Sequence, residues 1–227
     1  MFIKEVSARS VKDSRGEKTI EVSVNGAEWA SSPSGKSKGK YETPSYYTDG
    51  NLKFNVKFLN NWKKWLEINE FNDLERVEEV IIDKLKLKDV KDFGANALFA
   101  FESAVLKALA KEQKKQLWQV VNERVTRFPR PVGNAVGGGL HSSSFKKHPV
   151  FQEFLLIPKE KTFANNVRMM QEIYKQIGIK LKTKKVNDEG AWHTELDDEA
   201  VLELLSEFKD IDIGLDIASS SFYKNKL

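Results

Sequence analysis

Residues 131–158, PVGNAVGGGLHSSSFKKHPVFQEFLLIP, predict two short buried strands joined by an irregular glycine-rich loop. The first apolar run, 132–136, stops at three consecutive glycines, and the second, 151–157, is apolar except at Gln152 and Glu153. A carboxylate in a buried strand is uncommon unless it is paired, protonated or facing a ligand. Because His141 lies in the connecting loop, an acid, an amide and an imidazole can meet at one rim of the fold.

Taken alone, this stretch is also explained by a buried glutamate with satisfied hydrogen bonds and a histidine that faces solvent. Two later polar segments favour a site instead. They are Asn187-Asp188-Glu189-Gly190 and the run GLDIASS at residues 214–220. We therefore expect the acids at positions 153, 189 and 216 to gather around a common pocket.

The bulk composition excludes several classes of protein. The chain has 227 residues, which suits one large domain or two small ones. Cysteine is absent, so there is no disulfide framework, thiol nucleophile or zinc-thiolate site. The first residues do not form a signal peptide and no apolar run reaches the length of a membrane span, so we expect a cytoplasmic protein without a membrane partner.

The sequence pI of about 9.0 raises a nucleic-acid hypothesis, which other features disfavour. The formal net charge is only +4, and the lysines between 84 and 91 are interleaved with nearby acids such as Asp83, Asp89 and Asp92, as on a solvated helix face. A denser basic cluster comprises Lys180, Lys182, Lys184 and Lys185. Because no motif with groove-reading spacing accompanies these lysines, nucleic acid is not an expected partner.

Residues 2–30 alternate apolar and polar side chains with a period of two, which predicts a three-stranded antiparallel meander. Asn25-Gly26 is a hairpin signal because both residues tolerate positive φ. Helical periodicity follows at 52–68, 74–87 and 95–110. These elements predict an α+β amino-terminal domain over residues 1–126.

A polar, turn-rich segment at residues 31–50 is too long for a simple connection. Gly35-Lys36-Ser37 within it is similar to the end of a P-loop. The motif fails because Ala30 stands where a P-loop requires its first glycine, and Gly39 follows where a helix should begin.

Two prolines within residues 127–131 mark a predicted boundary, and a second domain is expected over 127–227. Its predicted order is strand, strand, helix, helix, strand, at residues 132–136, 151–157, 162–177, 197–208 and 211–217. Such alternation is typical of a parallel sheet with helices outside. A closed eight-stranded α/β barrel takes roughly 250 residues, whereas 100 residues follow Arg127. We therefore expect an open part of a barrel, which needs a partner or a different closure.

Several motifs follow one another along the chain: SARSVKDSRG at 7–16, PSGKSKG at 33–39, FGANALFA at 93–100, GGGLH at 137–141, QEF at 152–154, NDEG at 187–190 and GLDIASSSFY at 214–223. In this order they resemble the motifs of the enolase family, and the resemblance runs from about Val6 to Tyr223. The resemblance covers the whole chain but only the amino-terminal half of the family's architecture. It implies an α+β domain followed by the first part of an enolase-type α/β barrel, which opens with ββαα and then a further strand.

The resemblance also implies a reaction, the magnesium-dependent dehydration of 2-phosphoglycerate to phosphoenolpyruvate in glycolysis and gluconeogenesis. A proton beside a carboxylate is hard to remove. The family therefore uses two magnesium ions to neutralise the doubly charged intermediate while a base takes the proton.

The acidic motif positions acquire roles from the resemblance. Asp216 matches a metal-ligand aspartate, and a hard oxygen ligand suits magnesium. Glu189 matches the general acid that protonates the departing hydroxyl, and Glu153 matches its neighbouring carboxylate. Two acids held close together raise the pKa of one of them, which keeps a glutamate protonated for this task.

Three further positions are matched by the resemblance. Gln152 and His141 correspond to substrate-contacting positions, and Ser37 corresponds to the mobile-loop serine that reaches the second magnesium. Each also has a structural alternative, as a satisfied polar residue or a loop cap.

The chain departs from the family pattern at several places. Gly137 stands where the family has asparagine, Ala191-Trp192-His193 replaces glycine-phenylalanine-alanine, and Ser221 replaces a glutamate. Residues 146–150 look like an insertion, and Glu17-Lys18 replaces an asparagine-proline turn. The family's base lysine, its other acidic metal ligands and its phosphate-binding arginine belong to barrel strands that this chain does not contain.

Three hypotheses remain open from the sequence. The chain is one subunit of a split enolase, completed by a second chain that carries the later barrel strands, and we expect an oligomer. Alternatively, it is a catalytically inactive enolase-like binding or regulatory module, which the departures and the lysine cluster favour. The third is a truncated chain or gene remnant. The isolated chain is expected not to catalyse, because it lacks the base and enough metal ligands.

Overall fold

The structure is a computed structural model that describes residues 1–33, 35 and 38–221. The chain divides into two compact units. The first contains Met1–Gly35 and Tyr41–Thr126, and the larger part of the second is Arg127–Leu227. In the described part of the chain, no helix has both the length and the apolar character needed to cross a membrane.

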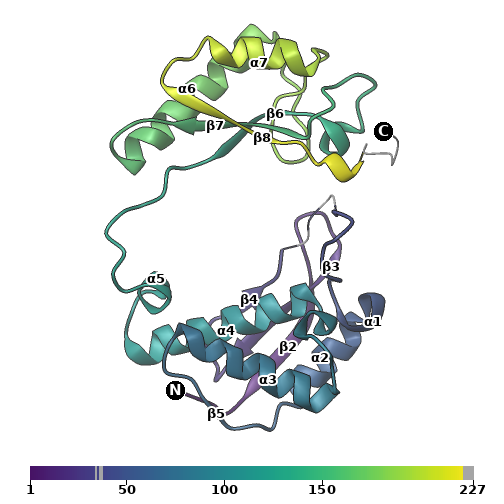
Figure 1. The fold of residues 1–227 in the computed structure, drawn as a ribbon, viewed down its shortest axis with the longest axis vertical. Coiled ribbons are helices and arrows are strands. Elements are labelled where there is room, and N and C mark those ends of the chain that lie inside the picture. The colour runs from purple at the N-terminus through teal and green to yellow at the C-terminus, as the bar shows by residue number, and fades with distance from the viewer. Residues whose placement is uncertain (34, 36–37, 222–227) are drawn as a thin grey trace. The chain divides into compact units, whose positions relative to one another are not determined.

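The sheet of the first unit is the predicted three-stranded antiparallel meander. Its strands are β2 (Val6–Lys12), β3 (Lys18–Val24) and β4 (Ala30–Ser31), in the order β2-β3-β4 (Figure 1). The hairpin signal is confirmed because Asn25 and Gly26 have φ values of 51° and 64°. The Ala27 N–H donates across this turn to the Val24 carbonyl at 2.9 Å.

The helices of the first unit follow the sheet. They are α1 (Tyr47–Gly50), α2 (Leu52–Asn60), α3 (Leu74–Leu85), α4 (Ala95–Gln113) and α5 (Leu117–Val121), with 3-10 turns at Phe71–Asp73 and Val90–Phe93. The predicted helix over 52–68 is wrong in its second half, since α2 ends at Asn60. Residues beyond it form β5 (Leu66–Glu67), which pairs antiparallel with β1 (Phe2–Ile3). Local periodicity cannot detect a strand whose partner lies at the other end of the domain.

Helix α4 fills the core of this unit with small residues. Ala97, Ala100 and Ala104 are fully buried, so the helix backbone can approach the sheet closely. Gly94 precedes it with φ of 101°, and a Cβ there would lie 2.3 Å from the Tyr46 Cα. Phe101 is also fully buried and packs edge-to-face on Trp62 with ring centroids 4.9 Å apart.

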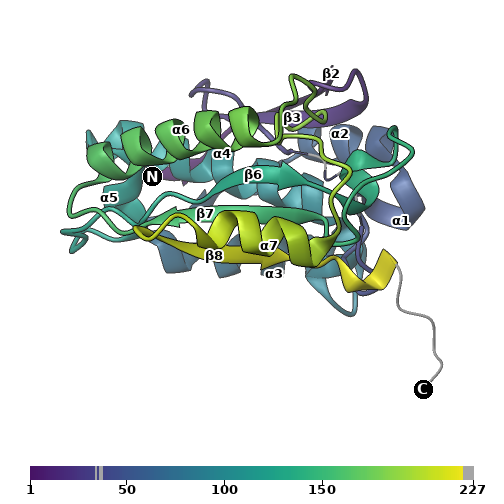
Figure 2. The ribbon, with the colours of Figure 1, turned by 90° about the horizontal axis from the view of Figure 1, so that it is seen from above.

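The second unit contains the predicted order of strand, strand, helix, helix, strand. The elements are β6 (Gly133–Gly137), β7 (Glu153–Pro158), α6 (Phe163–Lys180), α7 (Asp198–Ser206) and β8 (Ile211–Asp216). Short 3-10 turns lie at η3 (Gly139–Ser142) and η4 (Ser219–Ser221). The strand order is β6-β7-β8, and both helices lie on the same face of this sheet (Figure 1; Figure 2).

The predicted parallel pairing is wrong for this sheet, because β7 pairs antiparallel with both β6 and β8. A single helix returns the chain to the start of the preceding strand, which makes the next strand parallel. Here two helices in succession bring the chain back to the end at which it left β7. The next strand therefore runs in the opposite direction, and β6 and β8 run parallel to each other.

Side-chain alternation along β7 separates the two faces of the sheet. Phe154 and Leu156 are buried in one cluster with Ile177 of α6 and Leu205 of α7. Because successive side chains of a strand point to opposite faces, Glu153 projects from the face that these helices do not cover. The helices begin at side-chain caps, with Thr162 Oγ1 accepting from the Asn165 N–H and Asp197 Oδ1 from the Ala200 N–H.

The position of the core of the first unit is testable with two phenylalanines of α4. We expect Phe101→Ala to lower the free energy of unfolding by about 3–5 kcal/mol, because it leaves a cavity beneath Trp62. Phe99, on the same helix, is 51% exposed, and Phe99→Ala should change stability by only about 0.5 kcal/mol. Urea unfolding followed by tryptophan fluorescence measures both, and equal costs would contradict the assignment.

Candidate functional site

One row of residues crosses the sheet of the second unit at a single end. In the register, Gly137 of β6 lies opposite Glu153 of β7, which in turn lies opposite Asp216 of β8. Directly opposed residues of an antiparallel pair project from the same face. On the face away from the helices, the row therefore carries two carboxylates, those of Glu153 and Asp216. Gly137 adds no side chain to this face.

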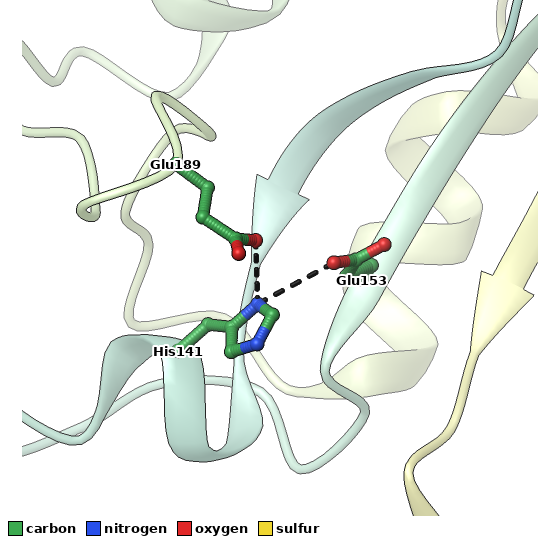
Figure 3. Close-up of side chains that lie close together, drawn as sticks. All are labelled: His141, Glu153 and Glu189. Atoms are coloured by element: carbon green, nitrogen blue, oxygen red, sulfur yellow. Dashed lines mark ion pairs between the residues drawn. The ribbon is translucent and has the colours of Figure 1, made fainter. Parts of the chain in front are cut away.

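His141 joins two carboxylates beside this row (Figure 3). Its Nδ1 lies 2.7 Å from Glu189 Oε2 and 3.4 Å from Glu153 Oε1. His141 comes from η3, Glu153 opens β7, and Glu189 belongs to the loop before α7. One ligand atom from each residue falls within 4.8 Å of the others, a spacing that could hold a metal ion or a proton shared between groups. Since the His141 side chain is 6% exposed, the cluster is shielded from water on the imidazole side.

The loop that carries Glu189 is held by the side chain of Asn187. Asn187 Oδ1 accepts hydrogen bonds from the N–H groups of Glu189 and Ala191, each at 3.0 Å. The Asn187 N–H donates to the Ala191 carbonyl at 2.9 Å, and Gly190 takes φ of 82° in the turn. The backbone of Glu189 is thus fixed independently of the contacts of its carboxylate.

Gly137 is required by the position of Asn187. A Cβ at residue 137 would lie 2.2 Å from Asn187 Nδ2 and 3.3 Å from the Ala191 Cβ. Asn187 cannot move aside freely, because its Oδ1 holds two loop amides. In this chain a side chain at position 137 would therefore overlap the amide of Asn187.

The carboxyl of Glu153 retains its proton far above the usual range. Burial raises the pKa of Glu153 most, and the negative charges of Glu189 and Asp216 and a hydrogen bond with Glu189 also raise it, so that together they bring it from 4.5 to about 7. At neutral pH this group is therefore about half protonated. A carboxyl with such a pKa is suited to general acid or base chemistry near neutrality.

The remaining residues predicted for the site are placed less closely together. Asp216 lies opposite Glu153 and its Oδ1 accepts from the Ala218 N–H at 3.0 Å, but it is not part of the three-residue cluster at His141. Gln152 is buried, and its Nε2 lies 3.5 Å from Asp216 Oδ2. Ser37 lies outside the residues that the structure describes. The roles assigned to these positions stay predictions.

Three supporting residues were not predicted from the sequence. Asn187 was recognised only as part of a motif, and its clamp on the loop depends on side-chain geometry. The Tyr174 hydroxyl donates to the Gly190 carbonyl, and the Trp192 Nε1–H donates to the Tyr174 carbonyl at 2.7 Å. Aromatic residues at helical or strand positions indicate packing, so no sequence signal distinguishes these hydrogen bonds from core contacts.

The raised pKa of Glu153 predicts a pH dependence of stability in the metal-free chain. The folded state keeps a proton that the unfolded state loses, so this contribution is present below pH 4.5 and is lost as the pH rises through about 7. Its size is at most about 3 kcal/mol, since each pKa unit corresponds to about 1.4 kcal/mol. Glu153→Gln stays uncharged in both states and should not show this loss.

Denaturant unfolding at a series of pH values measures this difference between the parent chain and Glu153→Gln. Glu172→Gln, on the exposed surface of α6, is the matched control and should keep the parent's slope. Parallel curves for the parent and Glu153→Gln between pH 4.5 and 7 would contradict the raised pKa.

The packing of Gly137 against Asn187 predicts a coupling between the two positions. Gly137→Ala should cost about 1–3 kcal/mol of unfolding free energy, because the new methyl group overlaps the Asn187 amide. In an Asn187→Ala background the same change should cost about 1 kcal/mol less, since the overlap is gone. Gly133→Ala, on the same strand, meets the flexible Met170 side chain first and should cost less than Gly137→Ala. Additive costs in the double-mutant cycle would disprove the coupling.

Comparison with known proteins places the chain in a family. Residues 3–121 match the model of the enolase N-terminal domain, and residues 125–227 match the model of the enolase C-terminal TIM barrel domain. Curated relatives include an enolase of Ehrlichia ruminantium (strain Welgevonden), 30% identical over 253 aligned residues that cover 99% of this chain and 59% of the relative. Enolases of Thermoplasma acidophilum and Picrophilus torridus are also 30% identical and cover 98% and 97% of this chain.

The chain thus spans about 59% of the length of these relatives. Both domain models match in sequence order and together cover nearly all of the chain, so it belongs to the enolase family.

Proposed function

We propose that this chain is the amino-terminal component of an enolase, a hydro-lyase that dehydrates 2-phosphoglycerate to phosphoenolpyruvate in the cytoplasm. Residues 1–126 form its α+β domain and residues 127–227 form the first part of its barrel. The convergence of His141, Glu153 and Glu189 carries the proposal, because three residues from three enolase motifs meet within 4.8 Å. A second chain with the remaining barrel completes the enzyme.

The carboxyl groups of Glu153 and Glu189 supply the proton that the departing hydroxyl group needs to leave as water. Glu189 lies beside Glu153 and shares a hydrogen bond with it, and the raised pKa of Glu153 keeps a proton on this pair near neutral pH. In the proposed reaction Glu189 gives a proton to the departing hydroxyl, which leaves as water. Glu153, whose pKa is raised, holds this proton and supplies it to Glu189 through their hydrogen bond.

His141 and Gln152 are the substrate contacts that this chain contributes. His141 is held by Glu189 and Glu153 at 2.7 and 3.4 Å, so the orientation of its ring is fixed by the same acids. Gln152 has a buried Oε1 without a hydrogen-bond partner among the described residues, which leaves it available to a donor of the substrate.

Asp216 and Ser37 are the residues of this chain that would hold magnesium. The donor type fits, because Asp216 offers carboxylate oxygens at a strand end and is exposed. Magnesium would supply positive charge that stabilises the anionic intermediate. One aspartate is too few ligands for a stable site, so the other acidic ligands and the base that removes the substrate proton must come from the missing barrel strands.

The exposed apolar side chains of the second unit support a completing partner. Leu215 and Ile217, at the end of β8, are each 40% exposed. In the part of the chain that the structure describes, β8 pairs on one side only, with β7. A further barrel strand would satisfy this edge and cover these side chains.

A second candidate, an inactive enolase-like binding or regulatory module, is favoured by the replacement of Gly-Phe-Ala with Ala191-Trp192-His193. Here Trp192 stacks on Tyr174 with centroids 4.8 Å apart, and Gly178 packs against its ring. Trp192 thus takes part in the packing of the second unit. Calorimetry of the completed protein with magnesium and 2-phosphoglycerate separates the two candidates, because an inactive module should show no coupled binding of metal and substrate.

The enzymatic proposal is tested by mixing this chain with the missing barrel portion, taken from the native source or from a relative enolase. We expect formation of phosphoenolpyruvate only when both chains and magnesium are present. Glu189→Gln should lower kcat by roughly 10²–10⁴, the usual contribution of a general acid. Glu172→Gln is the control and should remain active.

Two outcomes would contradict the proposal. A stable complex of both chains that remains inactive with magnesium would exclude the split enzyme. Turnover by the rigorously purified single chain would show that the missing barrel is not needed.

A further inference from the structure

A hollow of about 600 Å³ lies in the second unit, at the carboxyl end of α6. Its walls come from the loop after η3, from residues 180–185 and from residues 193–196, all within the second unit. Among the residues that the structure describes, four lysines line it, Lys147, Lys180, Lys182 and Lys185, and one acid lines it, Glu195. The lysine cluster seen in the sequence therefore forms part of a concave surface.

Most of this positive charge is not neutralised by neighbouring acids. Lys180 pairs with Glu207, with Nζ 2.7 Å from Oε2. Within the residues that the structure describes, Lys147, Lys182 and Lys185 form no ion pair. The hollow thus concentrates about three positive charges against one negative charge, which favours an anion.

Buried polar groups line the hollow together with the lysines. His193 is 8% exposed and stacks on Phe145 with ring centroids 3.7 Å apart, and its Nδ1 has no hydrogen-bond partner among the described residues. Thr194 is 7% exposed, and its Oγ1 accepts from the Leu196 N–H, which leaves its hydroxyl hydrogen free to donate. Burial lowers the pKa of His193, and Lys185 and His148 lower it further, whereas Glu195 raises it. The depression by Lys185 reflects the positive potential at this place.

Stabilisation of the α6 carboxyl end explains only part of the cluster. Lysines in and after the last turn of a helix interact favourably with its partial negative charge. Lys147 and His193 belong to other segments, yet both line the same hollow. An unpartnered buried imidazole nitrogen is also not needed to cap a helix.

We propose that this hollow binds a small phosphate-bearing anion. Its volume lies within the range of small-molecule sites, and lysines bind phosphate as point charges. A bounded hollow with a polar lining suits a compact anion better than a nucleic acid, which needs an extended basic track. The inference is independent of the reaction proposed above, because none of its residues belongs to the His141 cluster.

Calorimetry of the whole chain in metal-free, low-salt buffer tests the proposal with two probes, inorganic pyrophosphate and glycerol 3-phosphate. We expect saturable binding of at least one. Lys147→Gln and Lys185→Gln should each weaken it about tenfold, as expected for the loss of one charge-assisted contact. Lys175→Gln, on an exposed position of α6 outside the hollow, is the control and should bind as the parent does.

The outcomes distinguish the source of the phosphate. Tighter binding of pyrophosphate indicates a free polyphosphate, and tighter binding of glycerol 3-phosphate indicates a phosphate ester. Glu189→Gln should leave binding unchanged, which separates this site from the proposed catalytic one. The proposal is overturned if neither probe binds saturably, if Lys147→Gln and Lys185→Gln bind like Lys175→Gln, or if a short RNA binds more tightly than both probes with the same lysine dependence. Unfolding curves of the variants verify that each is folded.

Discussion

The register of β7 between its two neighbours is the constraint on which the site depends. It sets Gly137, Glu153 and Asp216 in one row and points Glu153 away from the helices that bury Phe154. A slip of one residue would exchange these faces, placing a carboxylate in the apolar core and a phenyl ring in the site. The burial of Phe154 and Leu156 therefore stabilises the fold, and it also fixes the face of the sheet on which the Glu153 carboxyl lies.

Gly137 and the side-chain amide of Asn187 also determine the position of the site residues. Gly137 leaves a space in the row, Asn187 fills it, and the same amide holds the backbone of Glu189. The two glutamates thus meet through elements that are separately anchored, one in a strand and one in a clamped loop. This arrangement can maintain repulsion between carboxylates, which would otherwise move apart and lose the elevated pKa of Glu153.

Sequence reasoning predicted most of this architecture, and its failures have identifiable causes. The meander was predicted because Asn25-Gly26 is a specific local signal, and the ββααβ order because its periodic segments are long. Strand direction failed because a parallel sheet was assumed, although the predicted order has only a loop between the first two strands and two helices before the third, and both connections allow antiparallel pairing. The end of α2 failed because β5 is defined by a distant partner. Among the site residues, His141, Glu153 and Glu189 were found by motif, whereas Asn187 acts through atoms whose positions no spacing rule encodes.

Among the residues that the structure describes, β8 is paired on one side only, and this has a consequence for how the chain assembles. An unpaired strand edge with apolar neighbours accepts any extended segment that offers backbone hydrogen bonds, including the same strand of a second copy. Under the proposed function, the pairing of a further barrel strand at this edge competes with self-association, and a high local concentration of that strand favours the correct pairing.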